Sequence, residues 1–234
     1  MIDNTSAFRY VDEIPLVVPE VNPHALADVR PGAIIANPNC STIQMLVALA
    51  PIHRAAGIDR INVATYQSVS GAGASALREL VEQTVDRLNF REPKLEKFAQ
   101  PIAFNVLPQI DTMQDNGYTR EEMKMVWETQ KIFEDPEIRV NATAVRVPVL
   151  YGHSEAVHLE TRDDIGIDEV RELLSAAPGV EVVDGAVYIA EAFAPRVERI
   201  DLATGELEVV VDEARGFVNP LELLAKRERI PLAS

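Results

Sequence analysis

Two long segments of alternating apolar and polar residues constrain the fold of this chain more than any other feature. They are RINVATYQSV (60–69) and IRVNATAVRVPVL (138–150), and both have the period of two that is typical of strands with one buried face. Segments with helical spacing lie between and around them. This order predicts an α+β fold, in which helices cover one face of a mixed, largely antiparallel sheet and leave the other face free.

The remaining elements follow from the spacing of apolar residues. Helices are predicted at residues 41–57, 74–88, 119–134 and 168–177. Pro51 is expected to bend the first helix or end it early. Residues 119–122 have the pattern of a capping box, and Asp168 is the expected N-cap of the last helix. One face of the second helix is expected to contain Leu77, Leu80, Val81, Thr84 and Leu88. Shorter strands are expected at 14–18, 32–36, 155–161, 180–183 and 206–211.

The composition limits the kinds of partner that the chain can bind. Its 234 residues carry a net charge of −15, which argues against binding to the phosphate backbone of a nucleic acid. No apolar run approaches the ~20 residues that a membrane helix needs. The one cysteine allows no internal disulfide, so a reducing cytoplasm is the default compartment. The expected partner is a small anionic molecule, and neither a nucleic acid nor a membrane.

The single thiol, Cys40, lies at a position that favours reactivity. It follows an apolar strand-like run and a Pro-Asn pair, and it directly precedes the first predicted helix. Free N–H groups and the dipole at a helix amino terminus stabilise a thiolate, and neighbouring N–H groups can form an oxyanion hole. The alternative is that Cys40 is a small buried hydrophobic residue, which is the commonest role of a free cysteine.

A nucleophilic cysteine needs a base, and His153 is the strongest candidate among the four histidines. It is expected in a glycine-containing loop after the strand that carries Arg146, so both side chains can reach one pocket. An Arg suits a carboxylate ligand, and a His suits proton transfer near neutral pH. Each also has an ordinary alternative, which is a surface salt bridge for Arg146 and a loop hydrogen bond for His153.

Two charged residues of the third predicted helix could contact an amino acid phosphate. Glu121 and Lys124 are three positions apart and therefore share a face. On spacing alone, a solvated ion pair that also involves Glu128 is the favoured interpretation. The glycines of SGAG (70–73) allow close backbone approach to a phosphate or a nicotinamide.

Five motifs together resemble the aspartate-semialdehyde dehydrogenase family, namely PNCSTIQM, YQSVSGAG, PIAFNVLPQID, EEMKMVWETQKI and VRVPVLYGHSE. They occur in the family's order, and the similarity extends from about residue 3 to residue 183. The resemblance implies NADPH-dependent reductive dephosphorylation of L-aspartyl-4-phosphate to L-aspartate 4-semialdehyde through a cysteine thioester. This step leads to lysine (through diaminopimelate), threonine, methionine and isoleucine.

The resemblance also implies an architecture. Residues 40–211 would form a catalytic and dimerisation domain of the glyceraldehyde-3-phosphate dehydrogenase-like type. Residues 1–39 would be the remnant of an NADP-binding Rossmann domain, and residues 212–234 would return toward that domain. A homodimer is the implied assembly.

The family's functional residues have counterparts in this sequence. The catalytic counterparts are Cys40 as the nucleophile, His153 as the acid and base, and Gln67 as the residue that orients the substrate. The substrate-binding counterparts are Arg146 for the carboxylate, Glu121 for the amino group, and Lys124, Arg9 and Asn39 for the phosphate. Ser70 and Gly71 match part of the NADP-binding loop, and no metal site is implied.

The NADP site implied by the family is incomplete in this sequence. No G-x-x-G-x-x-G turn, which would hold the cofactor pyrophosphate, precedes Cys40, and the tail at 212–219 matches the family only loosely. The sequence is therefore interpreted as a shortened form of the enzyme, and little or no NADPH-dependent turnover is expected from this polypeptide alone. Two alternatives are a non-catalytic dimerisation module and an enzyme similar to N-acetylglutamyl-phosphate reductase. The match of Glu121 to a free amino group argues against the second.

Overall fold

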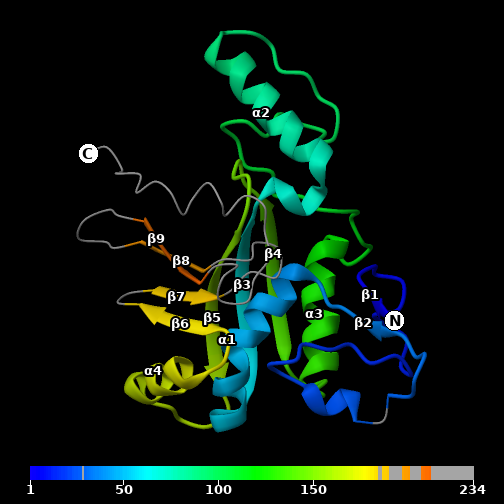
Figure 1. The fold of residues 1–234 in the computed structure, drawn as a ribbon, viewed down its shortest axis with the longest axis vertical. Coiled ribbons are helices and arrows are strands. Elements are labelled where there is room, and N and C mark those ends of the chain that lie inside the picture. Colours follow the sequence, from blue (N-terminus) through cyan, green and yellow to red (C-terminus); the bar gives the residue numbers. More distant parts are fainter. Residues whose placement is uncertain (28, 184–185, 190–196, 201–206, 212–234) are drawn as a thin grey trace.

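A mixed sheet forms the centre of the protein. The computed structural model describes residues 1–27, 29–183, 186–189, 197–200 and 207–211 (Figure 1). The sheet has the strand order β4-β3-β5 and consists of β3 (Ile58–Gln67), β4 (Arg139–Arg146) and β5 (His153–Thr161). β3 pairs in parallel with β4 and antiparallel with β5. The predicted α+β class and the mixed sheet are confirmed.

Helices cover one face of this sheet. α1 (Cys40–Ala56) contacts β3 and β5, and α3 (Arg120–Ile132) contacts β4 (Figure 1). α4 (Ile167–Ala176) lies beside α1, whereas α2 (Ala74–Leu88) projects away from the end of the sheet. The opposite face of the sheet carries exposed side chains from all three strands.

Short elements complete the described part of the chain. β1 (Ile2–Asp3) pairs in parallel with β2 (Ile35–Ala36), and two antiparallel pairs are formed by β6 (Val180–Val183) with β7 (Ala186–Ile189) and by β8 (Val197–Ile200) with β9 (Leu207–Val211). The two 3-10 helices are η1 (Pro23–Leu26) and η2 (Val69–Ala72). None of the helices in the described ranges is both long and apolar enough to cross a membrane.

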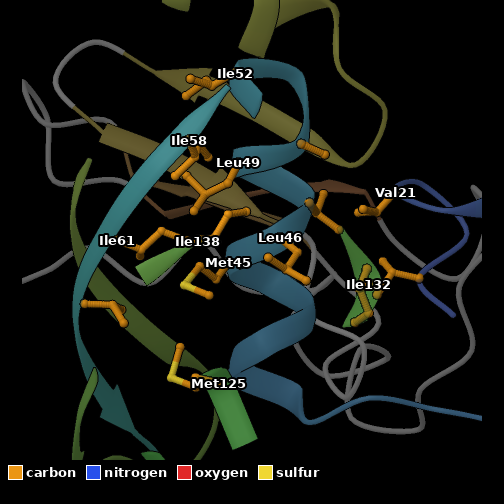
Figure 2. Packing of buried hydrophobic residues seen from close by; sticks show 14 of the residues in the cluster. Val21, Met45, Leu46, Leu49, Ile52, Ile58, Ile61, Met125, Ile132 and Ile138 are labelled. Carbon is orange, nitrogen blue, oxygen red and sulfur yellow. The ribbon is translucent and has the colours of Figure 1, made fainter. Parts of the chain in front are cut away.

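The main hydrophobic core lies between α1, α3 and the sheet, and Figure 2 shows its packing. α1 contributes Met45, Leu46 and Leu49, which belong to the same cluster of buried residues as Ile61 of β3 and Met125 of α3. Burying a side chain of this size contributes about 1.5–3 kcal/mol. This packing holds the amino terminus of α1 against one end of the sheet.

Three local expectations about the helices and strands were wrong. The early end expected at Pro51 is wrong, because α1 continues to Ala56 and both neighbours of the proline, Ala50 and Ile52, are buried in the core. Gly166, and not Asp168, is the N-cap of α4, and Asp168 lies in its first turn. His153 is the first residue of β5 and not a loop residue, because the pairing with β3 extends to the end of that strand.

The expected apolar face of α2 is also only partly right. Leu80 is buried, but Val81 is 50% exposed and Leu88 is 67% exposed. The buried face instead includes two polar residues, Glu79 and Gln83. Their side chains bind the backbone of the loop that follows: Glu79 accepts hydrogen bonds from the N–H groups of residues 96 and 97, and Gln83 accepts from those of residues 102 and 103.

The other predicted strands and the capping box of α3 are confirmed, except for the segment 14–18. The segment 14–18 forms only an isolated bridge, between Leu16 and Ala36. The segment at 212–234, where a return toward a Rossmann domain is expected, lies outside the described residues.

Candidate active site

Three strands place three candidate residues in one row. Gln67 at the end of β3 is paired with Arg146 of β4 on one side and with His153 of β5 on the other. Because β3 and β4 are parallel, their carboxyl ends meet at the same edge, where the antiparallel β5 begins. Gln67 and Arg146 are 1% and 6% exposed, so the row faces the covered side of the sheet.

The amino terminus of α1 brings the thiol to this row. Cys40 is the first residue of the helix, and its Sγ lies 3.4 Å from Nε2 of His153. Asn39 is the N-cap, and its Oδ1 accepts hydrogen bonds from the N–H groups of Ser41 and Thr42. The sequence prediction that Cys40, His153 and Arg146 lie close together agrees with this geometry.

The thiol is not activated in the way that its position suggests. Burial, followed by the charge of Glu121, raises the pKa of Cys40 to about 11. The N–H groups of Ser41 and of Cys40 itself favour the thiolate, but they do not outweigh these effects. Cys40 is therefore protonated at neutral pH in the protein without substrate.

Backbone contacts fix the imidazole and the guanidinium. The N–H of Ser68 donates to Nδ1 of His153 at 3.1 Å, which turns Nε2 toward the sulfur. Burial lowers the pKa of His153, so the imidazole is neutral at pH 7. Arg146 donates from Nη1 to the carbonyl of Ser68 at 2.7 Å and to Oε1 of Gln67 at 3.4 Å. Ser68 thus links the two side chains.

Glu121 connects the thiol side of the site to α3. Its Oε1 accepts hydrogen bonds from Nδ2 of Asn39 at 2.9 Å and from Nε2 of Gln67 at 3.3 Å, and its Oε2 accepts from Nζ of Lys124 at 2.8 Å. Lys124 also donates to Asp111. Burial opposes ionisation, but Lys124 and these hydrogen bonds hold the pKa of Glu121 below its usual range. A carboxylate at this position can bind the ammonium group of a ligand.

Glu128 lies two helical turns further along α3 and is fully buried. Its Oε1 accepts hydrogen bonds from Nη1 of Arg9 and from the hydroxyl of Tyr10, both at 3.1 Å, and its Oε2 accepts from the N–H of Asn39 at 2.6 Å. The expected ion pair between Glu121 and Lys124 is confirmed, but it is buried and not solvated, and it does not involve Glu128, which instead pairs with Arg9.

All the predicted site residues fall within one connected region. Gly71, in η2, lies next to the reactive pair, since a Cβ added there would be 3.1 Å from Nη1 of Arg146 and 3.5 Å from Cε1 of His153. The hydroxyl of Ser70 is 2.8 Å from that of Ser68. Within the described ranges, no group of three or more His, Cys, Asp or Glu residues is arranged to hold a metal ion.

The sequence did not identify three residues of this site. They accept hydrogen bonds from predicted site residues: Ser68 from Arg146, Asp111 from Lys124, and Glu128 from Arg9. Glu128 shares the helical face of Glu121 at a spacing of seven residues, which is the one signal that could have found it. Ser68 and Asp111 act through contacts whose sequence separation ranges from 13 to 85 residues, and no local pattern marks them.

Comparisons with known proteins agree on one family. A sequence profile described as "Semialdehyde dehydrogenase, dimerisation domain" matches residues 49–199. An aspartate-semialdehyde dehydrogenase from Vibrio mimicus is 62% identical over 188 residues, which are 80% of this chain and 60% of the relative. The chain thus spans less than two thirds of the length of this relative.

Solved structures give the same result. Aspartate semialdehyde dehydrogenase II from Vibrio cholerae, complexed with ASA, is 55% identical, with a TM-score of 0.78 over 92% of this chain and 67% of that chain. An aspartate semialdehyde dehydrogenase from Candida albicans, solved with NADP, is 26% identical, with a TM-score of 0.55 over 75% of this chain and 48% of that chain.

Proposed function

Because the chain belongs to the aspartate-semialdehyde dehydrogenase family, we propose that it acts in the NADPH-dependent conversion of L-aspartyl-4-phosphate to L-aspartate 4-semialdehyde. The observation that carries this proposal is the 3.4 Å approach of the Cys40 sulfur to Nε2 of His153, beside the buried guanidinium of Arg146. The reaction belongs to the synthesis of lysine, threonine, methionine and isoleucine. A free reactive thiol requires a reducing compartment, which favours the cytoplasm.

The charged groups of the site suit the two ends of this substrate. We assign the α-carboxylate to Arg146, whose planar guanidinium binds carboxylates with two hydrogen bonds. The α-ammonium group is assigned to Glu121. The phosphate is assigned to Lys124, Arg9 and Asn39, of which Arg9 and Asn39 contact the same carboxylate and therefore lie close together.

Binding of the substrate would itself activate the thiol. The charge of Glu121 is one of the two effects that raise the pKa of Cys40. An ammonium group bound to Glu121 offsets that charge and so lowers the pKa of the thiol. This offset would increase the fraction of thiolate in the occupied site.

The chemistry proceeds through a thioester. The sulfur of Cys40 attacks the acyl carbon, the bond from that carbon to the phosphate oxygen breaks, and the thiol proton leaves with the phosphate. Nε2 of His153 faces the sulfur and can take this proton once the ring's own proton lies on Nδ1, because in the free protein Nδ1 accepts from the N–H of Ser68 and Nε2 carries the ring proton. When the aldehyde is released, the carbon–sulfur bond breaks and the electron pair returns to sulfur. His153 then delivers to the sulfur a proton taken up from solvent, because the thiol proton has left with the phosphate. The covalent intermediate divides one difficult step into two.

The described residues fit the nicotinamide end of NADP. Gly71 is exposed and lies beside Arg146 and His153. Because it has no side chain, the flat nicotinamide ring can approach its backbone closely. We assign Ser70 and Gly71 to this contact. Bound NADPH supplies the hydride that reduces the thioester.

Acylation of the thiol tests the proposed function directly. Exposure of the purified chain to freshly prepared L-aspartyl-4-phosphate should add one aspartyl group, detected by intact-protein mass spectrometry and absent in Cys40→Ala. His153→Asn should slow the acylation by about 10²–10⁴-fold, because it removes the proton transfer. Little or no release of the group by NADPH is expected from this polypeptide alone. An adduct that persists in Cys40→Ala, or faster acylation by N-acetylglutamyl phosphate, would show that the assignment is wrong.

A further inference from the structure

One buried carboxylate joins the two segments that carry the proposed phosphate ligands. Glu128 accepts a hydrogen bond from the Arg9 guanidinium through Oε1 and from the Asn39 backbone through Oε2, and its side chain is fully buried. Arg9 belongs to the segment near the amino terminus, whereas Asn39 is the N-cap of α1. The two are 30 positions apart in sequence, and α3 is the element that both of them contact.

The contacts of Arg9 fix the direction of its guanidinium. Nε donates to the carbonyl of Thr5, Nη2 donates to the carbonyl of Asn4, and Nη1 donates to Glu128. A guanidinium has five N–H bonds, so two of them have no protein partner among the described residues and can bind a ligand. Without Glu128, the hydrogen bonds left to hold the Arg9 guanidinium among the described residues would be those to the neutral carbonyls of Asn4 and Thr5.

The next turn of α3 holds the backbone of the same segment. Nζ of Lys131 donates to the carbonyls of Arg9, Val11 and Ile14, at 3.0, 2.7 and 3.1 Å. Glu128 and Lys131 therefore hold different parts of this segment. Lys131 holds the path of the segment. Glu128 contacts both the guanidinium of Arg9 and the backbone of Asn39, whose side chain also donates to Glu121.

We propose that Glu128 is a positioning residue for phosphate recognition, which sets the Arg9 guanidinium and the Asn39 N-cap in the relative arrangement that receives the phosphate of the substrate. This inference rests on the proposed function, since it needs Arg9 and Asn39 to be phosphate ligands. It places Glu128 behind the site, because the buried carboxylate binds two of the groups that would bind the substrate and does not itself touch the substrate.

Substitution by glutamine tests the proposal. A carboxylate accepts hydrogen bonds with both oxygens, whereas an amide has one oxygen and one NH₂ group. In Glu128→Gln the NH₂ group must therefore face a second donor, which is either the guanidinium of Arg9 or the N–H of Asn39. The readout is the rate at which iodoacetamide alkylates Cys40 in the full chain at pH 8.5. Inorganic phosphate and L-aspartate are added separately as protecting ligands, because they probe the two ends of the site.

We expect both ligands to slow alkylation of the wild-type chain, because each blocks access to the sulfur. For L-aspartate, this block is expected to outweigh the lower pKa of the thiol that follows when its ammonium group binds Glu121. In Glu128→Gln, the phosphate concentration that gives half protection should rise at least tenfold, whereas that of L-aspartate should change less than twofold. Tyr10→Phe is the matched control, because it removes a hydrogen bond to the same carboxylate and leaves Arg9 and Asn39 in place. It should change neither concentration by more than twofold.

The outcomes separate the inference from the function on which it rests. An unchanged phosphate midpoint in Glu128→Gln, or an equal loss for both ligands, would overturn the positioning role. If the wild-type chain is protected by neither ligand, the proposed function fails first, and if it is protected by L-aspartate alone, the phosphate assignment of Arg9 and Asn39 fails. Should Glu128→Gln not fold, Glu128→Asp keeps the charge but is too short to reach both partners, and the same selective loss of phosphate protection is expected.

Discussion

Burial and, after it, the charge of Glu121 on α3 hold the pKa of Cys40 above its ordinary value. Glu121 raises the pKa of the thiol through its charge, while Lys124 and Asn39 keep Glu121 itself ionised. The same carboxylate that suits an ammonium ligand therefore holds the nucleophile in its protonated form. The state of the thiol depends on the occupancy of Glu121 and not on the helix terminus alone.

Removing the charge of Glu121 should make the free protein more reactive. In Glu121→Gln the pKa of Cys40 should fall toward its ordinary value, and each unit of that fall gives about tenfold more thiolate well below the pKa. We expect iodoacetamide to alkylate the variant about 3–10-fold faster than wild type at pH 8. The wild-type rate should rise with pH through 8–10 without a plateau, because the pKa is about 11.

Glu137→Gln serves as the control, since this residue is exposed and should leave the rate unchanged. A rate in Glu121→Gln that is equal to or below that of wild type would show that burial alone sets the pKa of the thiol.

At the level of elements, α1 and β5 enclose a second unusual acid. Glu155 lies opposite Thr65 of β3, two residues after His153. Its Oε1 is buried without a hydrogen-bond partner, and burial raises its pKa to about 8, although contact with Gln44 of α1 opposes the rise. The carboxyl group is therefore mostly protonated in the folded protein at neutral pH.

This acid should make the protein less stable as the pH rises. Between the ordinary glutamate pKa, about 4.5, and the folded value, about 8, the unfolded chain releases a proton that the folded chain keeps. The free energy of unfolding then falls by up to about 1.4 kcal/mol per pH unit in that window, and the effect is absent below it. Glu155→Gln should remove this slope and raise the free energy of unfolding at pH 7 by about 1–3 kcal/mol.

Urea unfolding at pH 5 and pH 7.5 measures both quantities. Glu160→Gln, at an exposed position of the same strand, should keep the wild-type slope. An identical loss of stability with pH in wild type and Glu155→Gln would exclude Glu155 as its source.

The sequence predicted the elements better than their contacts. The bounds of α2 and the capping box of α3 agree with the predictions, because periodicity and Thr119 with Glu122 are local signals. The expected early end of α1 at Pro51 was wrong, because the burial of the neighbouring residues offsets the lost backbone hydrogen bond. The burial of Glu79 could not be predicted, because the loop whose backbone donates hydrogen bonds to it follows 17 positions later.

For the site, residue types were predictable and electrostatics were not. Cys40 and His153 are marked by their chemistry and their neighbours in sequence. The high pKa of Cys40 depends on Glu121, 81 positions away, and on how deeply the fold buries the sulfur. Neither quantity can be obtained before the sheet and α3 are assembled.

At the scale of the whole molecule, none of the helices in the described ranges covers the second face of the main sheet, and we propose that a second copy of the chain covers it. α1 and α3 lie on the other face, and the matched profile describes a dimerisation domain. At the centre of the open face, Thr143, Ala64 and Ala156 form one row across β4, β3 and β5. Their small side chains allow another surface to approach closely, and Tyr66 nearby is 44% exposed.

A large charge in this row should separate the copies. Ala156→Arg places a guanidinium at the centre of the proposed interface, where it would be buried without a partner. Light scattering coupled to gel filtration should give a dimer for wild type and a monomer for Ala156→Arg, at protein concentrations of tens of micromolar. Ser175→Arg, at an exposed position of α4, adds the same charge elsewhere and should remain a dimer. An Ala156→Arg variant that remains dimeric would place the interface on another surface, and a monomeric wild type would show that the chain does not dimerise at these concentrations. In that case, the exposed row of small residues would need a different explanation.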